Sequence, residues 1–198
     1  VMRAANAGFS SVMLDASASP FEENIRRSLE VIKAVSKQGI SVEAELGHVG
    51  NGWVGSGEGS ETGPDMLTEP DKVVEFVERT GVDALAVSIG TAHGVYIKAP
   101  HLDIDRLKKI AKVSKAPLVL HGGSGTPEDQ LKDAIENGIS KINIYSELLH
   151  AWNSAMLAEL RKQPYMSVWP SVLRKTPDAA MRMVICKKIE LFGSAGKV

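Results

Sequence analysis

The feature that most constrains the fold is an alternation of short apolar runs with segments of helical periodicity. The segments between the runs carry apolar residues at helical spacing, as at Ile25, Leu29 and Ile32. Strands that are covered by helices on both faces of a parallel sheet have nearly continuous apolar sequences. The alternation therefore predicts an α/β fold with a parallel sheet. The predicted strands are residues 11–15, 41–47, 84–90, 117–121 and 141–144.

Residues typical of helix ends mark the predicted helices between these strands. Ser19 and Thr126 are predicted N-caps, each followed by proline, and Glu22 would complete a capping box with Ser19. Gly8, at the end of residues 1–8, is expected to close the last turns of a helix, which indicates that the chain is a fragment. Further helices are predicted at residues 103–114, 147–162 and 177–192.

Composition excludes several classes of protein. Lys and Arg number 23 and Asp and Glu number 24, so the net charge of -1 predicts no binding to nucleic acid or to a membrane surface. No apolar run is long enough to span a bilayer. Cys186 is the single cysteine, which excludes a disulfide within the chain and fits a reducing compartment. We therefore expect a cytoplasmic location.

Polar or glycine residues follow each of the five predicted strands. They are Asp15, Glu45 with Gly47, residues 90–94, residues 121–125 and residues 143–146. In parallel α/β folds the carboxyl ends of the strands carry the functional site. We expect these residues to gather at one edge of the sheet.

His93 and His121 each lie at a predicted strand end and are each followed by glycine. Neutral imidazole is a favoured ligand of zinc, and it also suits cobalt, manganese or iron. A pair of hydrogen-bonded core histidines is the alternative. A catalytic zinc usually has three protein ligands, so a third ligand must come from elsewhere.

Acidic residues near these histidines are further candidates. Glu43 and Glu45 are two apart and share one face of their strand, so they either support or hold a metal, or belong to a solvated strand end. The same alternatives apply to Asp15. Glu58 and Glu61, in a glycine-rich loop, are either solvated charges or a mobile acid or base.

Two turns that precede helices have the composition of anion sites. Gly122-Gly123-Ser124-Gly125 allows backbone N–H groups to approach an anion closely, and residues 143–146 also lead into a helix. On the last two strands of a barrel, such turns form a common phosphate site. Ordinary turn chemistry is the alternative.

Six segments in order along the chain resemble the class II, metal-dependent fructose- and tagatose-bisphosphate aldolases. They read VMLDAS, VEAELG, DALAVSIGTAHGVY, PLVLHGGSG, KINIYSEL and KKIELFGSAGK. The resemblance implies a TIM (β/α)8 barrel. A complete barrel takes about 250 residues, so we expect a partial barrel of about strands 4 to 8. Residues 1–146 would form it, and residues 147–198 would add its last helix and a C-terminal helical extension of the same domain.

The resemblance also implies roles for individual residues. The implied cofactor is Zn²⁺ or another divalent metal, with a monovalent cation near the substrate phosphate. Lys98 is either near that phosphate or a surface lysine. The implied ligands of the catalytic metal are His93 and His121, two of three histidines, and Glu45 and Asp15 match positions that can hold a second or displaced metal. The implied substrate-binding residues are Gly94, Gly122, Gly123, Ser124, Asn143, Ile144, Tyr145 and Ser146.

The activity implied is reversible aldol cleavage of a ketose 1,6-bisphosphate in carbohydrate metabolism, a glycolytic step. Fructose 1,6-bisphosphate would give dihydroxyacetone phosphate and glyceraldehyde 3-phosphate, with the metal acting as Lewis acid on the ketone. Tagatose 1,6-bisphosphate cleavage, a non-catalytic barrel subunit that supports a partner aldolase, and a phosphate-binding module are the alternatives. The family's C-terminal helices imply a homodimer or homotetramer at full length.

The chain departs from the family pattern at the catalytic acid. The family's Leu-Asp-His-Gly segment, which supplies that acid and a third histidine ligand, is absent from the sequence. We expect it upstream of Val1, which leaves the catalytic residue unassigned here and predicts little or no activity for these 198 residues alone. Tyr145 is bulky for its turn, and Ser146 stands where threonine is usual.

Overall fold

A computed structural model describes residues 1–51, 66–94, 99–165 and 167–197 of the chain. The chain forms two compact units, Val1–Asn143 and Ile144–Val198. The predicted assignment of residues 1–146 and 147–198 to a single domain stays a prediction.

The first unit is built on a sheet of five parallel strands. In spatial order they are β1 (Ser11–Leu14), β2 (Ser41–Leu46), β4 (Ala84–Val87), β6 (Leu118–Leu120) and β7 (Ile139–Ile142). The spatial order follows the chain order, as in a barrel and unlike a doubly wound sheet. A second, two-stranded parallel sheet pairs β3 (Gly50–Asn51) with β5 (Ala92–His93). The predicted α/β fold with a parallel sheet is confirmed.

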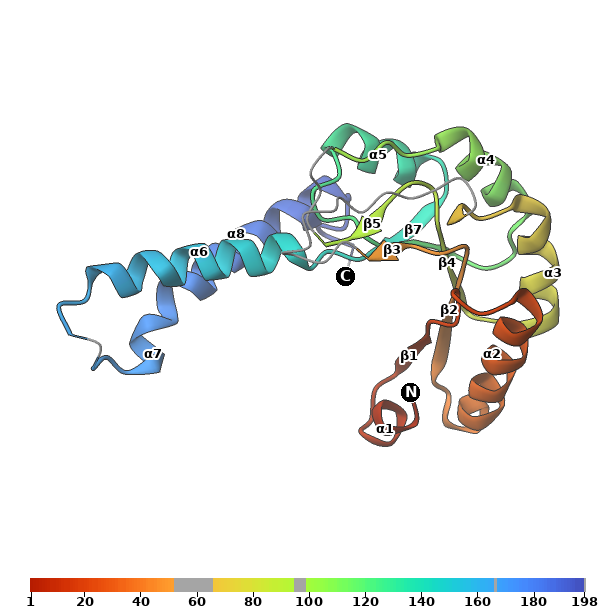
Figure 1. Ribbon diagram of the computed structural model, residues 1–198, viewed down its shortest axis with the longest axis horizontal. Helices are drawn as coiled ribbons and strands as arrows, with labels where there is room; N and C mark the ends of the chain where they lie inside the picture. Colours follow the sequence, from red (N-terminus) through yellow and green to blue (C-terminus); the bar gives the residue numbers. More distant parts are fainter. Residues whose placement is uncertain (52–65, 95–98, 166, 198) are drawn as a thin grey trace. The chain divides into compact units, whose positions relative to one another are not determined.

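Helices cover one side of this sheet. Figure 1 shows α2 to α5 in an arc around the strands, and the side chains of Ile25, Phe76, Leu107 and Leu131 fill the layer between helices and sheet with almost no exposure. The apolar spacing seen in the sequence is therefore the buried face of each helix. The helices of this unit are α1 (Met2–Asn6), α2 (Phe21–Val35), the 3₁₀ helix η1 (Ser36–Gln38), α3 (Pro70–Thr80), α4 (Ile104–Val113) and α5 (Glu128–Glu136).

Contacts between strands that are not neighbours show that the sheet is curved. Glu43 of β2 contacts His121, which follows β6, at 2.8 Å, and Lys141 of β7 at 2.9 Å. On a flat sheet, strands two or three places apart are separated by roughly 10–14 Å, and their side chains stand parallel. The three side chains therefore converge on a concave face. That these strands are about strands 4 to 8 of a (β/α)8 barrel stays a prediction.

Two predicted helix starts are wrong by one residue. Pro20 and Pro127, and not Ser19 and Thr126, occupy the N-cap positions of α2 and α5, and neither cap makes a side-chain hydrogen bond. The hydroxyl groups expected to cap are used elsewhere. Ser19 accepts from Arg27 at 3.3 Å, and Thr126 donates to the carbonyl of Gly122 at 3.4 Å.

The predicted capping box is wrong for the same reason. Glu22, expected to pair with Ser19, forms an ion pair with Arg79 of α3 at 2.6 Å. The last strand is also displaced, because β7 begins at Ile139 and ends at Ile142 where residues 141–144 were predicted. Tertiary contacts therefore decide these element ends.

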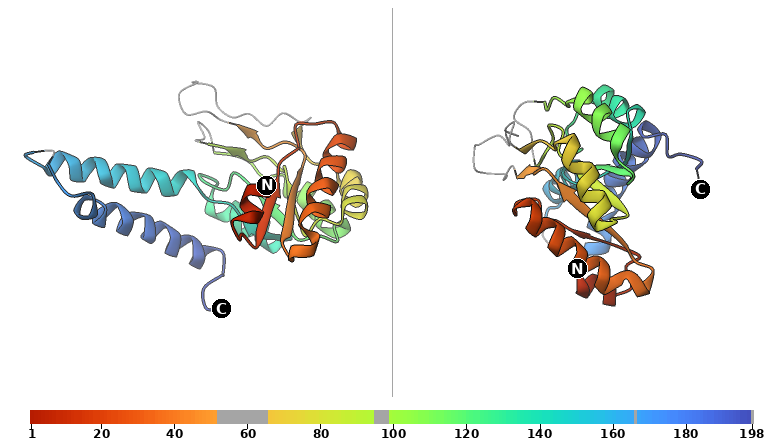
Figure 2. Two further views of the ribbon diagram at one scale, coloured as in Figure 1. Left: turned by 90° about the horizontal axis from the view of Figure 1, so that it is seen from below. Right: turned by 90° about the vertical axis from the view of Figure 1, so that its right-hand side faces the viewer.

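The second unit is a helical hairpin. Its helices are α6 (Ser146–Lys162), the short α7 (Pro170–Leu173) and α8 (Lys175–Leu191). Figure 2 shows α6 and α8 running antiparallel side by side. Trp152 Nε1 donates to Asp178 at 2.9 Å, and Lys188 pairs with Glu147 at 3.0 Å. The two long C-terminal helices expected from the sequence are present within two residues. In the part of the chain that the structure describes, no helix has the length and apolarity to cross a membrane.

Gly90, between β4 and β5, gives a test of this fold. Its φ is 114°, and a Cβ there would lie 2.4 Å from the carbonyl oxygen of His101. We predict that Gly90→Ala lowers the free energy of unfolding by about 3 kcal/mol, through the positive φ and the backbone collision together. Gly39→Ala is the matched control, because Gly39 has a φ of 66° and open space around it, and should cost about 1 kcal/mol. Urea denaturation followed by circular dichroism measures both, and equal losses would contradict the predicted packing.

Candidate active site

His121 lies at the centre of a cluster at the carboxyl ends of the strands. It directly follows β6 and is 3% exposed. Its Nδ1 lies 2.9 Å from Oε2 of Glu45, and its Nε2 lies 2.8 Å from Oε1 of Glu43. The two glutamates are two positions apart on β2, so both side chains lie on the same, concave face of the sheet. They are 6% and 1% exposed, so neither belongs to a solvated strand end.

The two carboxylates set the charge of this histidine. Burial by itself disfavours the imidazolium, but the hydrogen bonds and charges of Glu43 and Glu45 outweigh it and raise the pKa of His121 to about 9. For Glu43, burial opposes ionisation, yet the hydrogen bonds from His121 and Lys141 hold the pKa of the carboxyl below its usual range. A metal ion that bound His121 would have to displace a proton.

Lys141 extends the cluster to the last strand. Its Nζ lies 2.9 Å from Oε2 of Glu43 and donates to Oδ1 of Asn143 at 2.8 Å. A register shift between β6 and β7 places Lys141 beside Val119, where unbroken pairing would place Ser140. One lysine thus contacts both a carboxylate that holds His121 and a predicted substrate-binding amide.

Ser17 joins the cluster to Asp15 and His48. Its hydroxyl lies 2.7 Å from Asp15 Oδ1, 3.0 Å from Glu45 Oε1 and 3.0 Å from His48 Nδ1. Asp15 is exposed; partial burial raises the pKa of its carboxyl, but the two hydrogen bonds from Ser17 and the charges of His48 and His121 together lower it below its usual value. Asp15 therefore reaches Glu45 through Ser17, and His48 belongs to the same group.

His93 lies beside His121, as the sequence predicts. Their ring centroids are 5.7 Å apart, with the ring planes tilted by 47°. Nδ1 of His93 is buried and makes no hydrogen bond to any residue that the structure describes, and the same holds for the hydroxyl of Thr91. Since a buried polar atom without a partner costs about 1–3 kcal/mol, such an atom in a native site indicates an ion, a water or another ligand.

The residues present fit a divalent metal in part. His93 offers a nitrogen without a hydrogen-bond partner, and His121 and Glu45 stand next to it with donor types that such ions accept. Both nitrogens of His121 contact carboxylates, so one contact must be exchanged for the metal. No group of three His, Cys, Asp or Glu residues within the described ranges is arranged to hold an ion. The predicted site therefore needs a further ligand.

The two predicted phosphate-binding turns meet at Asn143. Gly123 N–H donates to the carbonyl of Asn143 at 3.2 Å, and Asn143 N–H donates to that of Leu120 at 2.9 Å. Gly122 has a φ of 66°, and a Cβ there would lie 2.3 Å from the carbonyl oxygen of Ala92, so only glycine fits against β5. Ser124, close to this junction, is 6% exposed.

Other predicted residues are not placed in this cluster. Gly94 follows His93 with a φ of 106°. Ile144, Tyr145 and Ser146 belong to the second unit, and their part in phosphate binding stays a prediction. The remaining candidates, Glu58, Glu61 and Lys98, lie outside the described residues.

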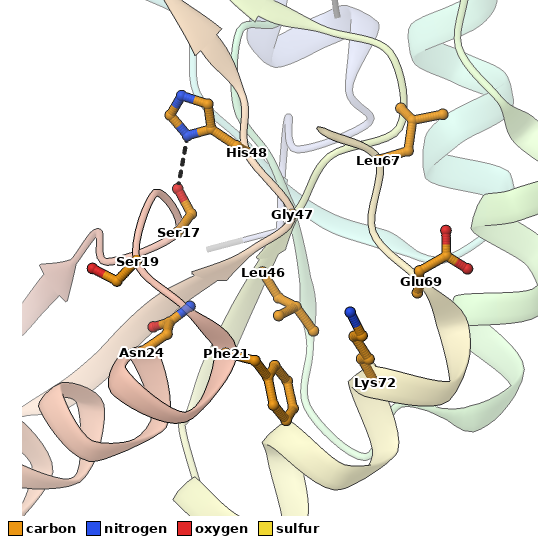
Figure 3. Close-up of a pocket in the computed structure, with 10 residues that line it drawn as sticks. All are labelled: Ser17, Ser19, Phe21, Asn24, Leu46, Gly47, His48, Leu67, Glu69 and Lys72. Atoms are coloured by element: carbon orange, nitrogen blue, oxygen red, sulfur yellow. Dashed lines mark hydrogen bonds between the residues drawn. The ribbon is translucent and has the colours of Figure 1, made fainter. Parts of the chain in front are cut away.

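A cavity of about 350 Å³ adjoins the cluster at Ser17 and His48. Figure 3 shows Ser17 bonded to His48 at one side of it, with Phe21 and Leu46 forming an apolar side and Lys72 extending from α3. Solvent therefore reaches the hydroxyl that links Asp15 with Glu45.

Two residues of the cluster were missed from the sequence. Lys141 is two positions before Asn143, and this alternation places both on one strand face, which was a usable signal. Ser17 follows Asp15 by two residues, a spacing at which a serine commonly bonds an aspartate. Nothing local in the sequence indicates that Ser17 also reaches Glu45.

The strand order, the helical cover and the cluster at the strand ends define a TIM-barrel-like protein of the class II aldolase type. The chain belongs to the family described as fructose-bisphosphate aldolase class-II, whose model matches residues 1–197.

Individual relatives agree with this placement. The chain is 46% identical over 192 residues to the uncharacterized protein YdjI of Escherichia coli K12, and this match covers 96% of the chain and 65% of YdjI. The crystal structure of the YdjI aldolase superposes with a TM-score of 0.82 at 40% identity, covering 99% of this chain and 66% of that one. The fructose-bisphosphate aldolase of Campylobacter jejuni superposes with a TM-score of 0.74 at 25% identity, covering 97% and 63%. The chain thus spans about two thirds of the length of these relatives.

The hydroxyl of Ser17 gives a test of the cluster. We predict that Ser17→Ala lowers the free energy of unfolding by about 1.5 kcal/mol, because Asp15 and Glu45 share the single proton of this hydroxyl and both lose it as a donor. Ser36→Ala is the control, since its exposed hydroxyl bonds only a backbone carbonyl three residues away, and should change stability by less than about 0.5 kcal/mol. Urea denaturation compares them, and an unchanged midpoint for Ser17→Ala would refute its linking role.

Proposed function

We propose that the protein is a class II aldolase that reversibly cleaves a ketose 1,6-bisphosphate. Fructose 1,6-bisphosphate is the proposed substrate, with dihydroxyacetone phosphate and glyceraldehyde 3-phosphate as products. The observation that carries the proposal is Nδ1 of His93, which is buried without a partner beside His121. Membership of the class II family and the family's dependence on divalent metal support it.

The proposed metal site is built on His93 and His121, with Glu45 beside His121, Asp15 reached through Ser17, and a further ligand still to be supplied. Zinc is the proposed ion, because two imidazoles and a carboxylate suit it. A divalent ion held there would supply Lewis acidity to the ketone carbonyl of the substrate. The histidines and Glu45 would fix its position, and Ser17 would hold Glu45 in place.

The proposed site for the substrate phosphate is the junction of the two turns at Asn143. Gly122, Gly123 and Ser124 belong to the first turn, residues 144–146 follow Asn143 in the chain, and Gly94 directly follows His93. The close approach of Gly122 to Ala92 places the glycine turn against the strand that carries His93. Because the glycine turn lies against the strand that carries His93, a single substrate molecule would contact both the phosphate-binding turn and the metal.

The second unit supports a proposal about assembly. Its helical hairpin exposes large apolar side chains, among them Leu157 at 49%, Trp169 at 78% and Met183 at 71%. Large exposed apolar patches often mark protein–protein interfaces. We therefore keep the prediction of a homodimer or homotetramer formed through these helices, in a cytoplasmic enzyme.

The activity is tested with the protein at its natural length and fructose 1,6-bisphosphate, with and without a chelator. We expect cleavage that the chelator abolishes and added zinc restores, measured by coupled detection of glyceraldehyde 3-phosphate. Cleavage that persists after metal removal would contradict the metal-dependent mechanism. Tagatose 1,6-bisphosphate, assayed in parallel, decides between the two sugars. If metal binds but neither sugar is cleaved, the non-catalytic subunit becomes the better interpretation.

Metal content tests the two histidines directly. We predict that His93→Ala and His121→Ala each reduce bound zinc in the purified protein from about one ion per chain to near none. His93→Ala is the cleaner variant, because Nδ1 of His93 has no hydrogen bond to lose within the described residues, whereas His121→Ala removes one partner from each of two buried glutamates. His101→Ala, at an exposed histidine, is the control. Unchanged zinc in His93→Ala, measured by atomic emission, would refute the assignment.

A further inference from the structure

Lys141, Glu43 and His121 form a line of contacts across the concave face of the sheet. Lys141 Nζ lies 2.9 Å from Oε2 of Glu43, and the other oxygen of that carboxylate lies 2.8 Å from Nε2 of His121. Glu43 is therefore bound at both oxygens, by an ammonium on one side and an imidazole on the other. A carboxylate bound in this way cannot rotate without losing one of its two partners.

Charge distinguishes the two nitrogens of His121. On the Nε2 side, Glu43 is already neutralised by Lys141. On the Nδ1 side, the partners of Glu45 other than His121 are the hydroxyl of Ser17 at 3.0 Å and the backbone N–H of Val49 at 3.1 Å, and both are neutral. An added cation is attracted to the second side and repelled from the first by the ammonium of Lys141. Nδ1 is therefore the nitrogen that a metal would take.

Lys141 has a second contact on the substrate side. It donates to Oδ1 of Asn143 at 2.8 Å, which fixes the orientation of that amide. With its oxygen bound to the lysine, the amide presents its NH₂ group as a donor to a ligand. The same ammonium thus orients a proposed metal ligand, through Glu43, and a proposed substrate donor.

We propose that the Lys141–Glu43 pair is a positioning device for this site. It holds His121 with a proton on Nε2 so that Nδ1 faces the metal, and it holds Asn143 with its NH₂ group towards the substrate. Carboxylates that accept the second N–H of a ligating histidine fix its tautomer and ring orientation in many metal sites. The inference rests on the proposed metal-binding role of His121.

A purely structural role for the pair makes a different prediction. The side chain of Glu43 is only 8% exposed, so a pair that merely stabilised the fold predicts a lower free energy of unfolding once Lys141 is removed and this buried carboxylate keeps only His121 as its described partner. Electrostatics alone would even favour metal binding when a nearby positive charge is removed. Weaker metal binding on removal of Lys141, with stability unchanged, therefore indicates positioning.

The test compares Lys141→Met, Lys141→Arg and Glu43→Gln in the protein at its natural length. Lys141→Met keeps the length of the side chain but removes the charge, whereas Lys141→Arg keeps the charge. Lys115→Met is the matched control, because Lys115 forms an exposed pair with Glu78 at 2.8 Å and lies before β6, at the opposite end of that strand from His121. Co²⁺ is the probe, since its visible absorption reports both affinity and ligand geometry.

We expect Lys141→Met and Glu43→Gln to weaken Co²⁺ binding by about 10- to 100-fold and to change the absorption spectrum of the bound ion. Lys141→Arg should restore most of the affinity, and Lys115→Met should match the wild type. In the zinc-loaded wild type, long-range ¹H–¹⁵N correlation should show His121 protonated at Nε2. Kinetically, Lys141→Met should also raise KM for the bisphosphate, because Asn143 is no longer oriented.

The outcomes distinguish failure of this inference from failure of the proposed function. Equal or tighter Co²⁺ binding with an unchanged spectrum in Lys141→Met would overturn the inference even if the enzyme cleaves fructose 1,6-bisphosphate. Zinc-loaded His121 protonated at Nδ1 would overturn it as well. Weakened metal binding in Lys141→Met, in a protein that cleaves no bisphosphate, would support the inference and refute the proposed activity. A wild-type protein that binds neither Co²⁺ nor zinc would overturn both.

Discussion

The pairing of His121 with Glu43 and Glu45 is the interaction on which the rest of the structure depends. Two carboxylates buried this deeply are strongly destabilising unless each has a hydrogen-bonded cationic or polar partner. The imidazole supplies a partner to both. Since Glu43 and Glu45 lie on β2 and His121 follows β6, with β4 between, these contacts require the sheet to curve and the three strands to end at one level.

The backbone around β2 holds that arrangement in place. Asn24, which is buried in α2, donates to the carbonyl of Glu45 at 2.8 Å. The buried hydroxyl of Thr68 bonds the carbonyl of Leu46 and accepts the N–H of Ser88 at 2.8 Å, so it joins the ends of β2 and β4. Gly47 makes room for this contact, because a Cβ there would meet Thr68. The site is thus built on strand ends whose backbone groups are tied to buried side chains.

The sequence predicted the elements well where periodicity is long and predicted their ends less well. The apolar face of α3, which buries Val73, Phe76 and Val77, is visible in the sequence at helical spacing. The N-caps of α2 and α5 were misplaced because the hydroxyls of Ser19 and Thr126 bond Arg27 and the carbonyl of Gly122 instead of the first N–H groups of the helices. The start of β7 was missed because the register shift beside Leu118 and Val119 depends on the neighbouring strand, which local sequence does not encode.

For the candidate site, the sequence by itself determined the class of fold, the residue types and their place at strand ends. Alternation along β2 put Glu43 and Glu45 on one face, and the motif around His121 placed it at the end of its strand. Only the tertiary structure decided which groups touch. The contacts of Lys141 with Glu43 and of Ser17 with Glu45 join residues 98 and 28 positions apart, respectively. Such contacts arise from sheet curvature and the competition of buried charges for partners, which are properties of the folded chain and not of any local segment.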